Sequence, residues 1–135
     1  MDYKKLAEFF NTHDIFAHQT GAHVLEVREG YAKSEIELSE ANSNSLGMLH
    51  GGAIYTIADI TASIAALSHG FCCTTLNANI NYLRAVKAGK VFAEATEIHN
   101  GRTTKIYEVL IKSEEGKNIS LATVTMFCST EPYKF

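Results

Sequence analysis

A single carboxylate lies within a long uncharged part of the sequence. Asp59 is the only Asp, Glu, Lys or Arg between Ala41 and Leu83, although 20% of the chain is charged. An ionised carboxylate away from water is costly unless it is paired or hydrogen-bonded, and burial favours the protonated form, which suits a general base. Asp59 is therefore a candidate catalytic residue. The alternative is a structural carboxylate that faces solvent or caps a loop.

Two glycines precede this carboxylate in the sequence His50-Gly51-Gly52-Ala53. A residue without a Cβ lets a ligand approach the backbone, and the first amides of a helix are unpaired donors at the positive end of its dipole. Such amides can polarise a carbonyl group as an oxyanion hole does. Glycines also allow tight turns and close packing, so the pair is informative only together with Asp59.

The spacing of the two groups predicts that two chains share each site. Along a helix that rises ~1.5 Å per residue, the eight steps from Gly51 to Asp59 span roughly 12 Å, whereas a carbonyl and its attacking group need contacts nearer 3 Å. One helix cannot supply both groups to one substrate. Two antiparallel copies across a two-fold axis place Gly51 of one chain opposite Asp59 of the other, which predicts a homodimer with two equivalent sites.

The hydrophobic period predicts the elements that position these groups. Residues 54–67 carry apolar side chains at helical spacing and on nearly every side, so we expect a helix that a sheet wraps. Residues 75–82 alternate, which predicts a strand. One face of this strand is expected to carry Leu76, Ala78, Ile80 and Tyr82, and the other Thr75, Asn77, Asn79 and Asn81.

The remaining elements complete an α+β fold. One strand is expected before the turn at Glu29-Gly30 and one after it. Three more strands are expected at residues 91–98, 102–112 and 118–128. A short amphipathic helix is expected at the N-terminus. The simplest way to bury the long helix is to curl an antiparallel sheet around it.

Composition limits the class of protein. The chain has 135 residues, of which 46% are hydrophobic, and this fits one domain over residues 1–135. A net charge of -3 leaves no basic excess for nucleic acid. Three cysteines without metal-site spacing favour reduced thiols in a cytoplasmic protein, and no metal site is expected. The charged N-terminus and Asp59 argue against a signal peptide and a membrane span.

A longer motif carries a resemblance to a known family. Asn44, Gly47, His50, Gly51, Gly52 and Asp59 form the pattern N-x-x-G-x-x-H-G-G-x-x-x-x-x-x-D, which NINYLR and HNGRTT follow. The chain resembles the hotdog-fold thioesterases over nearly its whole length, particularly the PaaI-like acyl-CoA thioesterases of phenylacetic acid degradation. The resemblance implies a six-stranded antiparallel sheet around one long helix, assembly as dimers and usually tetramers, and no cofactor.

The resemblance also implies roles for the catalytic candidates. Asp59 activates the attacking water as a general base or attacks the thioester itself, and the Gly51 amide of the partner chain polarises the carbonyl. Asn44 orients the carbonyl or the water, and His50 stabilises the loop. Thr75 matches a position where a hydroxyl helps to hold the water, although an ordinary packing role is equally expected.

Substrate-binding candidates lie around the same motif. Gly52 adjoins the helix start, and Ser63 lies one turn beyond Asp59. Four downstream cations are candidates for the phosphates of CoA, although simple solvation is the usual role of any one of them. They are Arg84, Lys87, Lys90 and Arg102. Related sequences often have proline where this chain has Ala85, which weakens the expected rigidity of that loop.

Three functions remain open at this point. The first is an acyl-CoA thioesterase that releases a free acid and CoA. The second is a hydratase or dehydratase on the same fold, which needs a histidine and a carboxylate to cooperate across an acyl chain, whereas His50 lies in the loop motif. The third is a non-catalytic acyl-CoA sensor, against which the presence of both Asn44 and Asp59 argues. The identity of the acyl group does not follow from the sequence.

Overall fold

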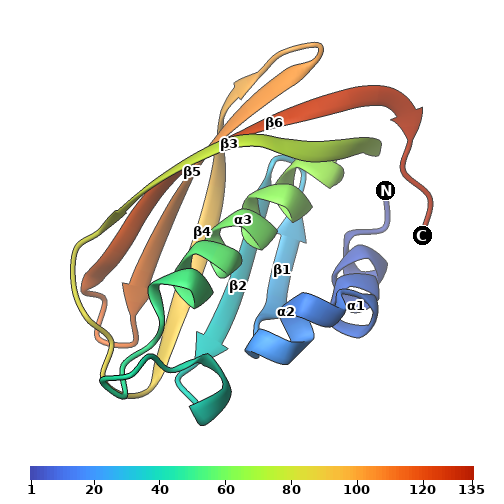
Figure 1. The fold of residues 1–135 in the computed structure, drawn as a ribbon. Coiled ribbons are helices and arrows are strands. Elements are labelled where there is room, and N and C mark those ends of the chain that lie inside the picture. Colours follow the sequence, from blue (N-terminus) through green and yellow to red (C-terminus); the bar gives the residue numbers. More distant parts are fainter.

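A curved antiparallel sheet surrounds one long helix in the computed structural model, which describes all 135 residues (Figure 1). The helices are α1 (Tyr3–His13), α2 (Ile15–Thr20), the short 3-10 turn η1 (Glu40–Asn42) and α3 (Gly51–Leu67). The strands are β1 (His23–Arg28), β2 (Tyr31–Glu37), β3 (Phe71–Tyr82), β4 (Lys90–Asn100), β5 (Thr104–Ser113) and β6 (Asn118–Pro132). This arrangement confirms the predicted hotdog fold.

The six strands lie in the order β1-β2-β4-β5-β6-β3, and every neighbouring pair is antiparallel. β1 and β3 are therefore the two edges of the sheet. The predicted turn at Glu29-Gly30 joins β1 to β2, and Gly30 has a positive φ of 68°. Arg102 was expected to begin a strand but lies in the turn between β4 and β5, because β5 begins only at Thr104.

The central helix α3 begins where His50 caps it. Nδ1 of the imidazole accepts a hydrogen bond from the Gly52 N–H at 2.8 Å. Helix α3 lies on the concave face of the sheet and contacts all six strands (Figure 1). The predicted wrapping nevertheless fails along one stripe of the helix, where residues about one turn apart remain partly exposed. These residues are Gly52, Tyr55, Asp59 and Ser63.

Strand β3 contains a β-bulge that its sequence pattern does not predict. The bulge lies between Thr75 and Asn77, so Leu76 has no partner on β6. Thr75 points toward α3, on the same side as Ala78, whereas Leu76 is 59% exposed. The expectation that Leu76 shares a face with Ala78, and that Thr75 lies on the opposite face, is wrong because regular alternation fails at a bulge.

Two helices rather than one form the N-terminal part of the chain, and α1 lies beside β1 (Figure 1). Asp2 caps α1 and Asp14 caps α2, and each carboxylate accepts a backbone N–H at 3.0 Å. Leu6 of α1 is completely buried, which anchors this helix to the core. No helix of the protein has the length and apolar composition that crossing a membrane requires.

Candidate active site

Asp59 lies on the uncovered stripe of α3 and is partly buried. The Thr75 hydroxyl of β3 donates a hydrogen bond to Asp59 Oδ1 at 2.7 Å. Thr75 Oγ1 also lies 3.5 Å from Met126 Sδ, so the hydroxyl is held between the helix and the sheet. The other carboxylate oxygen, Oδ2, accepts no hydrogen bond from the chain and is free for a reactant. Ser63 follows one turn later on the same stripe.

The first turn of α3 presents its amides beside the end of β3. The Gly51 N–H donates to no group of the chain, whereas the Gly52 N–H donates to His50 Nδ1. Because Nδ1 accepts this bond, a neutral His50 ring carries its proton on Nε2. The Tyr82 hydroxyl donates to the Gly51 carbonyl oxygen at 2.9 Å. Tyr82 belongs to the NINYLR motif, but no role for it follows from the sequence.

A groove of about 320 Å³ lies next to Gly51. Its polar side chains are Asn44 and Arg84, which brings these two predicted residues to the same place. The other side chains that line it are apolar or aromatic: Met48, Leu49, Ile54, Tyr82, Leu83 and Ala85. The groove can therefore hold an apolar chain with a few polar groups beside an unpaired amide.

Asn44 is held by the loop that it belongs to. Its Oδ1 accepts the backbone N–H groups of Leu46 at 2.9 Å and of Met48 at 3.1 Å. The side-chain oxygen is thus occupied, and only the NH₂ group of Asn44 remains to meet a substrate.

A second asparagine in this loop is not among the residues predicted from the sequence. Asn42 is buried, and its side chain bonds to the backbone of Thr20, Glu37 and Ser39 at 2.8 to 2.9 Å. The backbone carbonyl oxygen of Asn42 accepts the His50 N–H at 2.8 Å, which fixes the residue that caps α3. The spacing of Ser39 and Asn42, which form a capping box, is the sequence signal that identifies it.

The four predicted cations do not gather in one chain. Arg84 donates to the Asn118 carbonyl oxygen at 3.2 Å, and Lys87 is exposed in the loop after β3. Lys90 forms an ion pair of 3.2 Å with Glu35. Arg102 lies at the opposite end of the sheet. One chain therefore cannot bring all four cations to one phosphate group.

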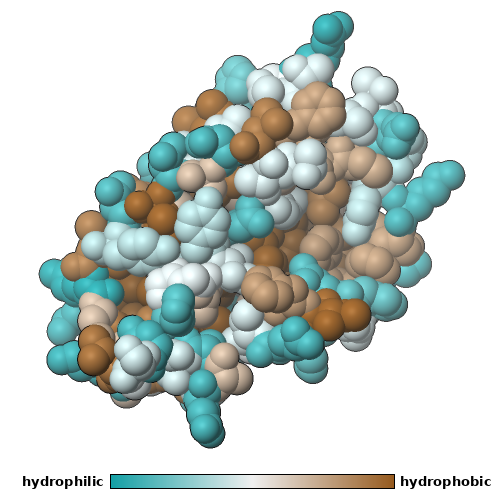
Figure 2. Space-filling view, viewed as in Figure 1, coloured by the Kyte–Doolittle hydropathy of each residue, from teal (hydrophilic) through white to brown (hydrophobic).

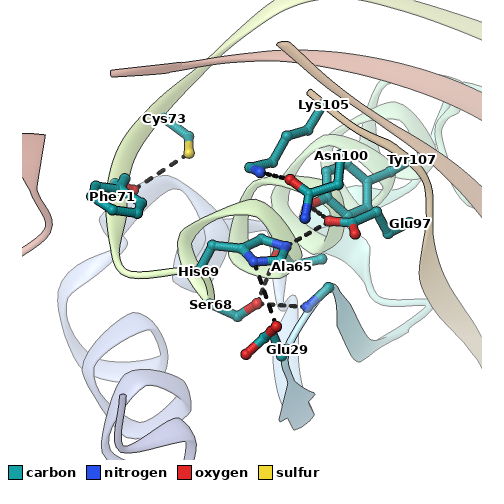
Figure 3. Close-up of polar contacts among 11 residues, drawn as sticks. Glu29, Ala65, Ser68, His69, Phe71, Cys73, Glu97, Asn100, Lys105 and Tyr107 are labelled. Carbon is teal, nitrogen blue, oxygen red and sulfur yellow. Dashed lines mark hydrogen bonds and ion pairs between the residues drawn. The ribbon is translucent and has the colours of Figure 1, made fainter. Parts of the chain in front are cut away.

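Another polar cluster lies at the C-terminal end of α3 (Figure 3). No sequence motif predicts it. His69 Nε2 lies 2.6 Å from Glu97 Oε2, and the Tyr107 hydroxyl donates to the same oxygen at 2.9 Å. Burial and the Glu97 carboxylate raise the pKa of Tyr107 above its ordinary value, so it remains a donor. Lys105 is 6% exposed and bonds to the Asn100 side-chain oxygen. No three His, Cys, Asp or Glu side chains are grouped as a metal site requires.

The two candidate groups on α3 lie far apart within one chain. Asp59 and the Gly51 N–H are eight residues apart on one helix, which is roughly 12 Å. A carbonyl bound by the Gly51 N–H is therefore out of reach of Asp59 in the same chain.

Comparison with known proteins identifies the family. Residues 46–120 match the model of the thioesterase superfamily. The chain is 30% identical over 131 residues to an Archaeoglobus fulgidus protein described as an esterase, which covers 96% of this chain and 85% of that protein. It is 25% identical over 109 residues to the acyl-coenzyme A thioesterase PaaI of Escherichia coli, covering 80% of this chain and 78% of PaaI.

Solved structures agree with this assignment. The structure of E. coli PaaI matches with a TM-score of 0.90 over 97% of this chain and 96% of that chain, at 23% identity, which supports the fold. A hypothetical thioesterase of Streptococcus pneumoniae, solved with coenzyme A, matches with a TM-score of 0.82 at 29% identity, covering 89% of this chain and 94% of that one. The chain belongs to the thioesterase superfamily and is a thioester hydrolase, and its predicted resemblance to PaaI-like thioesterases is confirmed.

Proposed function

We propose that the protein is an acyl-CoA thioesterase whose two active sites are each shared between the chains of a homodimer. The observation that carries this proposal is the pair of groups on α3: a carboxylate held by Thr75 and an unpaired Gly51 N–H, too far apart to act on one carbonyl from one chain. The relative named as an acyl-coenzyme A thioesterase and the S. pneumoniae thioesterase solved with coenzyme A support CoA esters as the substrate class.

The free edge of β3 supports the dimer. β3 has β6 on one side and no strand on the other, over 12 residues. The face that carries α3 and β3 mixes apolar and polar side chains (Figure 2), and several large apolar ones are exposed. They are Tyr55, Phe71, Leu76 and Tyr82. Antiparallel pairing of two β3 edges covers these side chains and sets the two α3 helices antiparallel, Asp59 of one chain opposite Gly51 of the other.

In the proposed reaction the thioester carbonyl accepts a hydrogen bond from the Gly51 N–H of one chain. Asp59 of the other chain, held through Oδ1 by Thr75, uses Oδ2 either to take a proton from the attacking water or to attack the carbonyl itself. The Gly51 N–H stabilises the negative oxygen of the tetrahedral intermediate. The intermediate then expels the CoA thiolate, which leaves the free acid, or an anhydride with Asp59 that water hydrolyses.

The same dimer suggests how the predicted cations serve one CoA. Arg84 and Lys87 follow β3 at the end where α3 begins, and Arg102 lies at the other end of the sheet. Antiparallel pairing brings the turn containing Arg102 of the partner to the Arg84 end. We expect phosphate contacts from both chains, with the Asn44 NH₂ group directed at the carbonyl or the water.

A substitution at Gly51 tests the proposal directly. Gly51→Pro removes the N–H at the first helical position, where proline is well tolerated, and His50 already has the extended conformation (φ -63°, ψ 137°) that a residue before proline prefers. Gly51→Ala is the matched control, because it keeps the N–H and its added Cβ meets the Tyr82 ring at an ordinary 3.5 Å. Release of free thiol from a panel of acyl-CoAs should fall about 100-fold in Gly51→Pro and little in Gly51→Ala.

Mixed dimers test the shared site. A Gly51→Pro chain paired with an Asp59→Asn chain retains one site with both groups intact, so verified heterodimers should recover about half of the wild-type rate. No recovery would contradict sharing. Tight binding of acyl-CoA by the wild-type protein without thiol release would favour a non-catalytic sensor. If an enoyl-CoA in the panel lost its double bond without thiol release, a hydratase would be favoured.

A further inference from the structure

One peptide unit at the start of α3 is hydrogen-bonded at both ends. The carbonyl oxygen of Gly51 accepts the Tyr82 hydroxyl at 2.9 Å, and the N–H of Gly52, in the same peptide unit, donates to His50 Nδ1 at 2.8 Å. Hydrogen bonds on the two sides of one amide polarise each other. The orientation of this peptide unit is thus fixed from β3 on one side and from the capping residue on the other.

Such fixing matters because glycine has no conformational preference of its own. The Gly51 N–H belongs to the preceding peptide unit, whose His50 carbonyl oxygen accepts the N–H groups of Ala53 at 2.9 Å and Ile54 at 3.1 Å. A Gly-Gly pair samples more backbone conformations than any other, so the torsion at Gly51 that joins the two peptide units depends on contacts from outside the pair. The Tyr82 ring also packs on Gly51, 3.5 Å from the place of a Cβ there. A hydrogen-bond donor for an oxyanion is effective only when its direction is set before the reaction.

We propose that Tyr82 is a positioning residue: by fixing the Gly51–Gly52 peptide unit it restrains the φ of Gly51, and so the direction of the Gly51 N–H in the preceding His50–Gly51 peptide unit. This inference rests on the proposed function of that N–H. Tyr82 does not touch the reacting carbonyl in this scheme. It acts through Gly51 as Thr75 acts on Asp59, and β3 therefore supplies one hydroxyl to each of the two reactive groups of α3.

The state of the phenol agrees with this role. Partial desolvation of the phenol, with a contribution from the neighbouring Tyr55, raises the pKa of Tyr82 above its ordinary value, although the side chain as a whole is exposed. The hydroxyl therefore remains protonated and donates throughout the neutral and mildly alkaline range. No pH dependence of the reaction near neutrality is expected from it.

In a shared site, each Tyr82 affects only one of the two active sites of the dimer. Tyr82 sets the amide of its own chain, but that amide works with Asp59 of the partner. Thr75 and Tyr82 of the same strand therefore serve different active sites, seven residues apart in sequence. A tyrosine that only stabilised the whole fold or the dimer would affect both sites equally.

The first test removes only the hydroxyl. Tyr82→Phe should lower kcat about tenfold and leave KM within about twofold, because a misdirected donor weakens transition-state binding more than substrate binding. Tyr31→Phe is the matched control: it also loses one 2.9 Å hydrogen bond, to Glu94, but far from α3. An unchanged kcat in Tyr82→Phe would overturn the proposal, as would an equal loss in Tyr31→Phe.

A second measurement needs no substrate. In ¹⁵N-labelled protein, Tyr82→Phe should shift the Gly52 amide proton upfield and speed its hydrogen exchange, since the bond to His50 loses its cooperative partner. It should also shift the Gly51 amide signal, because the torsion at Gly51 is no longer restrained. Tyr31→Phe should move neither signal. Unmoved glycine signals in Tyr82→Phe would overturn the proposal whatever the activity. Moved signals in a protein that hydrolyses no acyl-CoA would leave the positioning intact and refute the proposed function.

Mixed dimers test the direction. When Tyr82→Phe and Asp59→Asn lie on different chains, the surviving site has an intact Tyr82, and its rate should equal that of a wild-type site. When both substitutions lie on one chain and the partner is wild type, the surviving site uses the altered Gly51 amide and should be about tenfold slower. Equal rates in the two arrangements would overturn the proposal.

Discussion

The two edges of the sheet are treated in opposite ways. At the β1 edge, the Asn11 side chain of α1 bonds to both backbone groups of Val24, accepting its N–H at 2.8 Å and donating to its carbonyl oxygen at 3.0 Å. Bulges interrupt both edge strands, β1 at Leu25 and β3 at Leu76, so they do not distinguish the two edges. At the β3 edge, 12 residues have no neighbouring strand on one side. The chain thus covers one edge with its own side chain and leaves the other without a neighbouring strand.

Charge follows the same division. β1 contains Glu26 and Arg28, whereas Phe71–Tyr82 contains no charged residue. Charges on an edge strand discourage pairing with another chain, and a long uncharged edge invites it. The open edge is also the strand whose hydroxyls hold Asp59 and Gly51. Assembly and chemistry are therefore expected at the same edge.

The largest effect is expected where the open edge meets the chemistry. Asp59→Asn should lower kcat at least ~1000-fold, because the amide can neither accept a proton nor attack a carbonyl. Its matched control is Glu97→Gln, a carboxylate bonded to His69 and Tyr107 at the other end of α3. Thiol release by Glu97→Gln, measured well below its melting temperature, should stay within about twofold of wild type. Similar losses in the two variants would break the link between the β3 side and catalysis.

Charges placed on the open edge should separate the chains. Asn77→Lys combined with Asn79→Lys puts like charges where two β3 strands meet, and should raise the dimer dissociation constant about 100-fold. Sedimentation at several concentrations measures this, and the rate per chain should fall as the dimer is diluted. Leu25→Lys, on the closed β1 edge, should change neither. A fully active monomer would refute the claim that activity requires pairing at the β3 edge.

Opening the closed edge should affect stability and not activity. Asn11→Ala leaves both polar groups of Val24 without their partner and should lower the free energy of unfolding by about 2 kcal/mol. Urea denaturation measures this loss. The exposed Gln19→Ala serves as the control and should cost less than about 0.5 kcal/mol. A loss of thioesterase activity in folded Asn11→Ala would show that the two edges are not independent.

The smallest effect concerns the hydroxyl that meets Asp59. Thr75→Val keeps the shape of the side chain and removes the bond to Oδ1, so kcat should fall about tenfold. Thr74→Val makes the same change on the exposed residue beside it and should leave kcat unaltered. Steady-state kinetics with one good acyl-CoA substrate separates the two. Equal values would assign Thr75 a packing role.

Most of the fold is predictable from local pattern. The apolar period identifies α3, and alternation with three Gly-containing turns, at Gly30, Gly101 and Gly116, identifies the strands around it, because each signal lies within a few residues. The motif residues near the start of α3 also meet as expected, with Asn44 and Arg84 on one groove. The distance between Asp59 and Gly51 follows from the helical rise per residue alone.

The contacts that hold the site are not predictable in the same way. Thr75 reaches Asp59 only because of the bulge at Leu76, and alternation alone assigns it to the wrong face. Tyr82 reaches Gly51 across 31 residues of chain, and Arg102 is separated from the other cations by the length of a strand. These pairings depend on register between distant segments, which no local pattern encodes.

The bulge in β3 also determines where this family of sequences can change length. Leu76 faces no residue of β6, so a relative that lacks it has a regular strand in which Thr75 and Tyr82 keep their orientations. Loss of Asn77 has the same result, whereas loss of a residue from Ala78 to Asn81 with the bulge retained reverses Tyr82 and removes its hydroxyl from α3. Between Thr75 and Tyr82, gaps in alignments should therefore concentrate at Leu76 and Asn77.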